Sequence, residues 1–133
     1  AGFIVPDLPL DESEPLDTAL AAAGLALIHL VSPVTPPERV DAAARATRGF
    51  LYAVNVTGIT GGAKAAGEGL QDYLAGVAAK SPVPVCAGFG VRSAAQVREL
   101  GAIVPGVIVG SALVEALERG ESPGAFLAAL RPA

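Results

Sequence analysis

Short apolar runs alternate with Ala/Leu/Glu-rich stretches along the whole sequence. The apolar runs predict strands at 3–5, 25–31, 50–56, 83–87 and 107–109. Because these runs are continuous rather than interleaved with polar residues, we expect strands that are buried on both faces, as in parallel sheets. Alternation of strand and helix at a spacing of roughly 22–30 residues indicates βαβ units with right-handed crossovers.

Capping residues mark the helices between these strands. The predicted helices cover 12–23, 36–48, 69–80, 94–100, 112–119 and 123–130. Ser93 is a predicted N-cap. Thr35, followed by Pro36 and three residues later by Glu38, has the pattern of a capping box.

The number of strand–helix units limits the fold class to two architectures. Five units fit 133 residues, whereas a complete (β/α)₈ barrel needs roughly 200–250 residues. The periodicity therefore allows a flavodoxin-like open sheet or a little over half of a barrel. No change of composition marks a linker, so we expect a single domain over residues 1–133. The absence of Met and the start at Ala1 and Gly2 suggest a trimmed, incomplete or engineered chain.

Composition excludes several classes of protein. With 52% apolar and 17% charged residues, the chain has enough apolar surface to fold, which argues against intrinsic disorder. No apolar run approaches the roughly 18 residues of a membrane span, and no basic segment followed by an apolar stretch resembles a signal peptide. We expect a soluble, cytoplasmic protein.

Charge and cysteine content narrow the possible partners. The formal net charge is −4 and the basic residues are scattered, so no nucleic-acid partner is expected. One Cys excludes an intramolecular disulfide framework. One Cys and one His do not favour a structural zinc site, and no metal site is expected.

Three successive predicted strands end in glycine, at the edge where parallel α/β folds bind ligands. The third strand is followed by a Gly-rich loop that includes Gly61, the fourth by Gly88 and Gly90, and the fifth by Gly110 and Ser111. Any one of these glycines is more often a simple strand end. The three ends together, with Gly110 and Ser111 opening a helix, favour a phosphate site built from backbone amides. The Gly-Phe-Gly segment is not a dinucleotide fingerprint, because it lacks the third glycine.

Other polar residues have simpler interpretations. Asp7 follows the first predicted strand, where a structural or interface role is favoured over catalysis. His29 and Cys86 lie within apolar strands and are expected to be packed in the interior. Of Tyr52 and Tyr73, only Tyr52 lies on a predicted strand, from which it could point into the centre of a barrel.

Four segments carry a family resemblance. The succession PDLPLDES, FLYAVNVTGITGG, PVCAGFGVRS and VIVGSALVEAL resembles the C-terminal part of the tryptophan synthase alpha chain family, in order and spacing, over essentially all of the sequence. The resemblance implies an α/β fold, a (β/α)₈ TIM barrel, of which this chain covers about the last five βα units, strands four to eight.

The resemblance also implies a function. Members of the family are lyases of tryptophan biosynthesis that cleave indole-3-glycerol phosphate to indole and glyceraldehyde 3-phosphate. They assemble with a tryptophan synthase beta chain into a heterotetramer. The pyridoxal phosphate belongs to the beta chain, so the resemblance implies no cofactor in this chain.

Carried over to this sequence, the resemblance assigns roles to individual residues. The implied donors to the substrate phosphate are Gly61, Gly90, Gly110 and Ser111. The implied walls of the indole pocket are Tyr52, Phe89, Ile4, Leu30 and Ile108. Thr60 is the implied loop residue that orders on substrate binding, and Asp7 and Pro9 would face the beta chain.

The two catalytic carboxylates of the family, a Glu and an Asp, belong to the second strand and the loop after it. The sequence starts at what would be the fourth strand, so no catalytic residue is expected in this chain. Without that acid–base pair, the chain alone should be inactive. The alternatives are a non-catalytic phosphate-binding α/β domain and another phosphate-binding barrel enzyme of biosynthesis; the Thr-Gly-Ile-Thr-Gly loop does not favour the latter.

Overall fold

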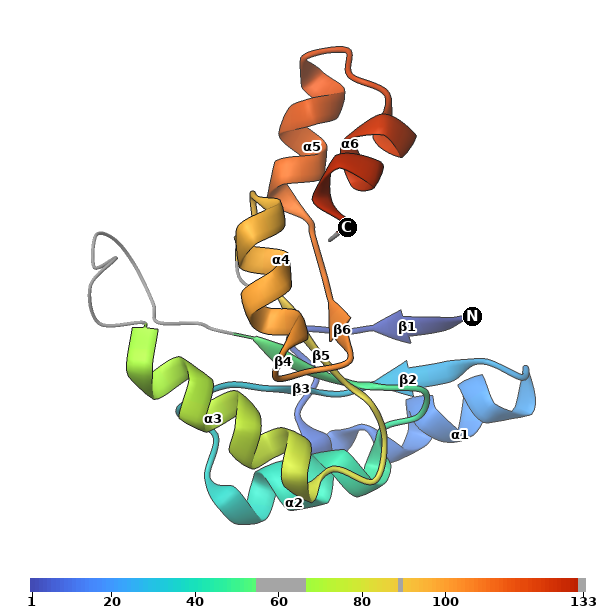
Figure 1. Ribbon diagram of the computed structural model, residues 1–133. Helices are drawn as coiled ribbons and strands as arrows, with labels where there is room; N and C mark the ends of the chain where they lie inside the picture. The colour runs from blue at the N-terminus through green and yellow to red at the C-terminus, as the bar shows by residue number, and fades with distance from the viewer. Residues whose placement is uncertain (55–66, 89, 132–133) are drawn as a thin grey trace.

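The structure, a computed structural model, describes residues 1–54, 67–88 and 90–131 (Figure 1). Its strands are β1 (Gly2–Ile4), β2 (Ala26–Ile28), β3 (Leu30–Val31), β4 (Leu51–Val54), β5 (Val85–Gly88) and β6 (Gly106–Val107). Its helices are the 3₁₀ turn η1 (Leu10–Glu12), α1 (Glu14–Ala22), α2 (Pro37–Ala46), α3 (Gly67–Lys80), α4 (Ala94–Gly101), α5 (Ser111–Glu118) and α6 (Pro123–Leu130). No helix within these three ranges is long and apolar enough to cross a bilayer.

The strands pair in the order of the sequence, and every pair is parallel. β1 pairs with β2, and β3, β4, β5 and β6 follow one another in a second sheet. Since only His29 separates β2 from β3, the predicted strand 25–31 lies between the first and third predicted strands. A flavodoxin-like order would leave that strand at the edge, paired only with the first. The observed order excludes this alternative and is that of an arc of a barrel.

Helices bury one face of the sheet. On β4 and β5, Leu51, Ala53, Val85 and Ala87 are almost completely buried, while the residues between them are half-buried. The buried face packs against apolar residues of the helices and of the segment after α4, among them Val40, Ala43, Leu74, Val77 and Val104. Figure 1 shows α1, α2 and α3 together below the strands.

The expectation that the strands are buried on both faces is wrong for this structure. β1 is exposed throughout, with Phe3 at 52% and Ile4 at 42% of full exposure. The opposite face of β4 and β5 stays half-open because the described helices pack on the other side. The continuous apolar runs therefore leave an apolar sheet face that is only partly covered.

Buried polar groups explain why the strand 25–31 is interrupted. The backbone N–H of His29 donates to Thr47 Oγ1 at 3.0 Å, and that hydroxyl donates to the Phe50 carbonyl at 2.6 Å. The His29 carbonyl accepts from the Tyr52 N–H at 3.0 Å. The Thr47 hydroxyl thus takes the place of a strand partner, which keeps the buried N–H of His29 paired.

Two of the predicted helix starts have different outcomes. Ser93 caps α4 as expected, in a reciprocal capping box with Gln96. The prediction for Thr35 is wrong: α2 begins at Pro37 without a side-chain cap. Thr35 Oγ1 instead accepts from the Ser32 N–H at 2.9 Å, because a hydroxyl at this position can also close the preceding turn.

His29 packs in the interior, as expected, and makes the fold sensitive to acid. The residue is 7% exposed, and its Nε2 has no partner among the described residues. Burial lowers its pKa below the ordinary 6.5, while the nearby Asp17 carboxylate opposes the shift. The folded state therefore binds fewer protons than the unfolded chain as pH falls below about 6.5, and this loss of stability grows with acidity.

We predict that the free energy of unfolding decreases between pH 7.5 and pH 5.5, as measured by urea denaturation across that range. Because the sequence contains a single histidine, His29→Leu should flatten most of this dependence. An equally steep dependence in His29→Leu would show that another group is responsible.

Candidate functional site

The half-open sheet face carries a row of register-matched residues. Leu30 pairs with Tyr52, Tyr52 with Cys86, and Cys86 with Gly106. Directly paired residues of parallel strands point to the same side. The four positions therefore form one layer across β3 to β6, on the face opposite the buried core.

Two more of the predicted pocket residues share this face. Ile108 lies two residues after Gly106, and its N–H donates to the Ala87 carbonyl at 2.7 Å, which continues the ladder beyond β6. Ile4 pairs with Ile28, two residues before Leu30, so it lies on the same side, in the adjoining β1–β2 sheet. Phe89, the remaining pocket residue, lies outside the described residues.

Glycines on this face make room for the larger side chains of neighbouring strands. A Cβ at Gly88 would lie 2.5 Å from both Cε2 and Oη of Tyr52, and a Cβ at Gly106 would lie 2.5 Å from Sγ of Cys86. Burial raises the pKa of the Tyr52 hydroxyl and of the Cys86 thiol. The contact at Gly88 shows that Tyr52 lies across the backbone of β5. The raised pKa favours the protonated form of the Cys86 thiol, which is the less reactive form.

The predicted phosphate donors follow this face at the carboxyl ends of β5 and β6. Gly90 has φ +56°, a left-handed conformation that favours glycine. Gly110 is the N-cap of α5, and Ser111 is the first residue of the helix. The first turn of any helix has backbone amides without intrahelical partners, so the start of α5 can present amides to an anion.

The remaining predicted residues are not brought into this site. Gly61 and Thr60 lie outside the described residues. Asp7 and Pro9 are exposed between β1 and η1. Pro9 and Leu30 both line a cavity of about 200 Å³ that His29 and Arg39 also border. Neither Gly90 nor Gly110 lines that cavity.

Tyr73, which has no strand position, packs against the buried core from α3. Its hydroxyl is buried without a partner among the described residues, and burial raises its pKa strongly. The structure thus confirms that Tyr52, not Tyr73, is the tyrosine on the open face of the sheet.

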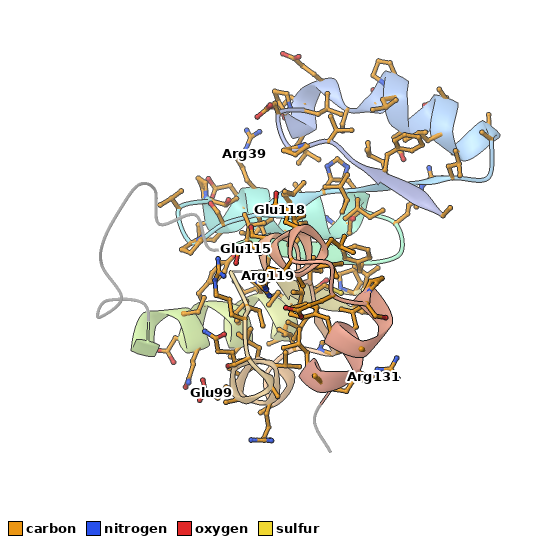
Figure 2. The ribbon with its side chains drawn as sticks, turned by 90° about the horizontal axis from the view of Figure 1, so that it is seen from above. Arg39, Glu99, Glu115, Glu118, Arg119 and Arg131 are labelled. Atoms are coloured by element: carbon orange, nitrogen blue, oxygen red, sulfur yellow. The ribbon has the colours of Figure 1, made fainter. Side chains whose placement is uncertain are left out.

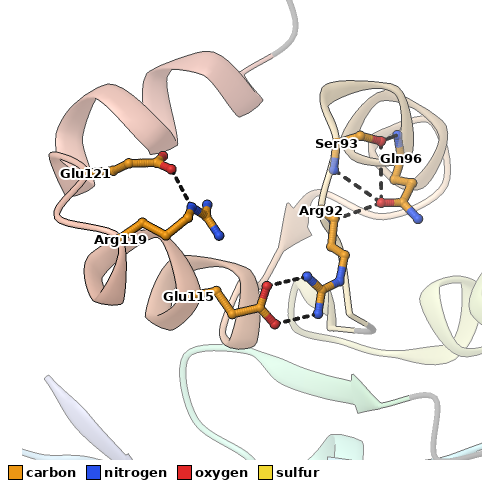
Figure 3. A network of polar contacts seen from close by, with 6 residues as sticks. All are labelled: Arg92, Ser93, Gln96, Glu115, Arg119 and Glu121. Atoms are coloured by element: carbon orange, nitrogen blue, oxygen red, sulfur yellow. Dashed lines mark hydrogen bonds and ion pairs between the residues drawn. The ribbon is translucent and has the colours of Figure 1, made fainter.

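An ion pair that the sequence did not indicate joins the segment after β5 to α5. Arg92 Nη1 and Nη2 donate to Glu115 Oε2 and Oε1 at 2.6 and 2.7 Å (Figure 3). The hydrogen bonds from Arg92 hold the pKa of the Glu115 carboxyl below its usual range. Since 23 residues separate the partners, no local pattern could have revealed the pair.

Acidic residues are absent from the described strands, β1 to β6. In the ranges that the structure describes, no three His, Cys, Asp or Glu side chains gather as a metal site would require. The open face is therefore suited to enclosing an apolar ring, and its far edge to binding an anion through amides.

We predict that Gly88→Ala lowers the free energy of unfolding by about 1–3 kcal/mol, because the new methyl group overlaps the Tyr52 ring. In a Tyr52→Ala background the same change should cost clearly less, and urea denaturation of all four proteins measures the coupling. Gly76→Ala is the matched control, since a Cβ there meets nothing within 4 Å. Equal costs in both backgrounds would contradict the contact.

Comparisons with known proteins give a consistent family assignment. The family model described as "Tryptophan synthase alpha chain" matches residues 1–129. The tryptophan synthase alpha chain of Roseiflexus sp. (strain RS-1) is 42% identical over 127 residues, which cover 96% of this chain and 48% of that protein.

Solved structures agree on the fold. A structure of tryptophan synthase from Mycobacterium tuberculosis matches with a TM-score of 0.81 and 38% identity, over 99% of this chain and 52% of that one. The tryptophan synthase complex from Pyrococcus furiosus matches with a TM-score of 0.81 and 26% identity, over 97% and 53%. The chain thus spans about half the length of the proteins that it matches.

Proposed function

Because this chain belongs to the tryptophan synthase alpha chain family, we propose that it serves the cleavage of indole-3-glycerol phosphate to indole and glyceraldehyde 3-phosphate. The observation that carries the proposal is the arrangement of the open sheet face. Leu30, Tyr52 and Ile108 share an apolar face, and the glycine-marked strand ends follow at its carboxyl edge. One face thus suits the two ends of a molecule with an apolar ring and a phosphate.

The phosphate end of the substrate would bind to backbone amides. In this proposal the phosphate accepts hydrogen bonds from Gly90, Gly110 and Ser111, with Gly61 as a fourth donor. The partial positive charge of the α5 N-terminus favours the dianion without a basic side chain. This accounts for phosphate binding by a chain with a net charge of −4.

The indole end would bind on the apolar residues. Tyr52, Leu30, Ile108 and Ile4 would enclose the ring together with Phe89. Tyr52 lies across the backbone at Gly88. Its aromatic ring would therefore line the side of the indole pocket without filling it. Thr60 would order its loop when the substrate binds.

The cleavage itself needs an acid and a base that act on the ring and on the glycerol hydroxyl. In the family that this sequence resembles, the pair is a Glu and an Asp of the second strand and the loop after it. The described strands carry no carboxylate, which supports assigning the pair to residues outside these 133. This chain would bind and orient the substrate, and the protons would move on groups that it does not supply.

The exposed Asp7 and Pro9 are proposed to face a tryptophan synthase beta chain, which would hold the pyridoxal phosphate. The structural relative from Pyrococcus furiosus is a tryptophan synthase complex, which supports assembly with a second chain. We further propose that the protein acts in the cytoplasm.

We predict that the 133-residue chain alone releases no indole from indole-3-glycerol phosphate above the uncatalysed rate, in a spectrophotometric indole assay. The alpha chain from Roseiflexus, assayed in parallel, serves as the positive control. Sustained turnover by the 133-residue chain alone would contradict the assignment of the acid–base pair.

We predict that Gly110→Asp, introduced into a catalytically active protein that contains this sequence, raises KM for indole-3-glycerol phosphate about tenfold or more. A carboxylate there repels the phosphate dianion, and like charges brought together cost on the order of several kcal/mol. The fold should persist, because Asp is a favourable N-cap and a Cβ at Gly110 meets nothing within 4 Å.

Ser122→Asp is the matched control for this substitution. It adds the same charge at the N-cap of α6, a helix that the proposal leaves out of the site, and KM should stay unchanged. An unchanged KM in Gly110→Asp would remove the start of α5 from the substrate site.

A further inference from the structure

The segment after β5 and the helix after β6 touch through one bidentate ion pair. Arg92 follows Gly90 by two residues, and Glu115 lies one helical turn after Ser111 on α5. The two parallel hydrogen bonds of 2.6 and 2.7 Å connect the chain segments that carry the proposed phosphate donors. The planar guanidinium and carboxylate fix the orientation as well as the distance between these segments.

We propose that Arg92 and Glu115 are positioning residues, which hold the Gly90 backbone and the first turn of α5 at the separation that a phosphate requires. This inference rests on the proposed function, because it takes Gly90, Gly110 and Ser111 as the phosphate donors. Neither side chain touches the phosphate in this arrangement; both act through the backbone segments to which they belong.

The Arg92 end of the pair is held firmly. The Arg92 N–H donates to Gln96 Oε1 at 2.8 Å, and the same amide oxygen completes the capping box with Ser93. Val91, directly before Arg92, is 2% exposed. The guanidinium thus projects from a backbone that is fixed at the start of α4. The ion pair can therefore hold α5 at a defined distance from the segment after β5, in addition to neutralising a charge.

The Glu115 end is also part of a packed element. Ala112 and Ala116 on either side of it are buried, and α5 packs against α6. Figure 2 shows Glu115 with Glu118 of α5 and with Arg119, the C-cap of that helix, apart from Arg39. The positive charge of Arg119 adds to the lowering of the Glu115 pKa, so Glu115 stays ionised and available to Arg92.

The position of the pair raises a competing possibility, that Arg92 binds the phosphate directly. The two readings differ in what Glu115 does. In direct binding, the carboxylate competes with the phosphate for Arg92, and its removal strengthens binding. In positioning, the carboxylate is the anchor for the β5–α4 segment, and its removal weakens binding.

A second ion pair, at the end of α5, provides a matched control. Arg119 Nε donates to Glu121 Oε1 at 2.7 Å (Figure 3). The side chains of Arg119 and Glu121 are 56% and 45% exposed, close to the 56% and 42% of Arg92 and Glu115. Arg119 and Glu121 are two residues apart and join α5 only to the turn that follows it. Breaking this pair changes the surface charge without separating the two segments that carry the proposed phosphate donors.

The test uses an active protein that contains this sequence, with sn-glycerol 3-phosphate as the phosphate probe and indole as the ring probe, both titrated at low salt. We expect Glu115→Gln to weaken glycerol 3-phosphate binding about two- to fivefold, the range for an exposed ion pair, and to leave indole binding unchanged. The charge-swapped double variant Arg92→Glu/Glu115→Arg should restore most of the loss. Glu121→Gln, which removes a carboxylate from the Arg119–Glu121 pair as Glu115→Gln does from the first pair, should bind both probes like the wild type.

Four results would overturn the inference. Tighter binding of glycerol 3-phosphate by Glu115→Gln would show that Arg92 is a direct ligand, and unchanged binding would show that the pair does not position the site. Equal weakening of indole binding would indicate general loss of structure. A wild-type protein that binds indole but no glycerol 3-phosphate would overturn the proposed phosphate site itself, and the inference with it.

Discussion

The parallel hydrogen-bonded ladder, carried from one strand to the next in sequence order, determines where every functional segment lies. β1 pairs with β2, and β3 to β6 pair successively. The two sheets adjoin at His29, whose carbonyl accepts from the Tyr52 N–H while its own N–H donates to Thr47 Oγ1. Because all the strands run the same way, their carboxyl ends meet at one edge. Gly90 and Gly110, twenty residues apart in the sequence, can serve one ligand only for that reason.

The architecture could be predicted from local patterns. Apolar runs, capping residues and glycines are short-range signals, and they located the strands, the start of α4 at Ser93 and the glycine-marked strand ends. The order of the strands was not accessible in the same way, because pairing is a long-range property. The half-open apolar face was missed for a related reason: an apolar run indicates that burial is favourable but not how much of it the described helices supply.

In the candidate site, too, local features could be predicted from the sequence and long-range contacts could not. Tyr52 and Gly110 were found because their positions on a strand and before a helix are local features. The contact of Tyr52 with the Gly88 backbone and the Arg92–Glu115 pair depend on how neighbouring strands and helices approach one another. Thr35 shows the limit of a short motif, since its hydroxyl had two backbone partners within reach and the turn at Ser32 took precedence over the helix.

The glycines opposite Tyr52 and Cys86 have a consequence for how such a site can change over time. The space above the sheet depends on pairs of residues on adjacent strands, in which a large side chain faces a glycine. The glycine therefore limits how large its neighbour can be. A bulkier residue at Gly88 would demand a smaller one at Tyr52, and the two positions would have to be exchanged together. The space above this face is therefore set by the two residues together, and a larger side chain at Gly88 is accommodated only with a smaller one at Tyr52.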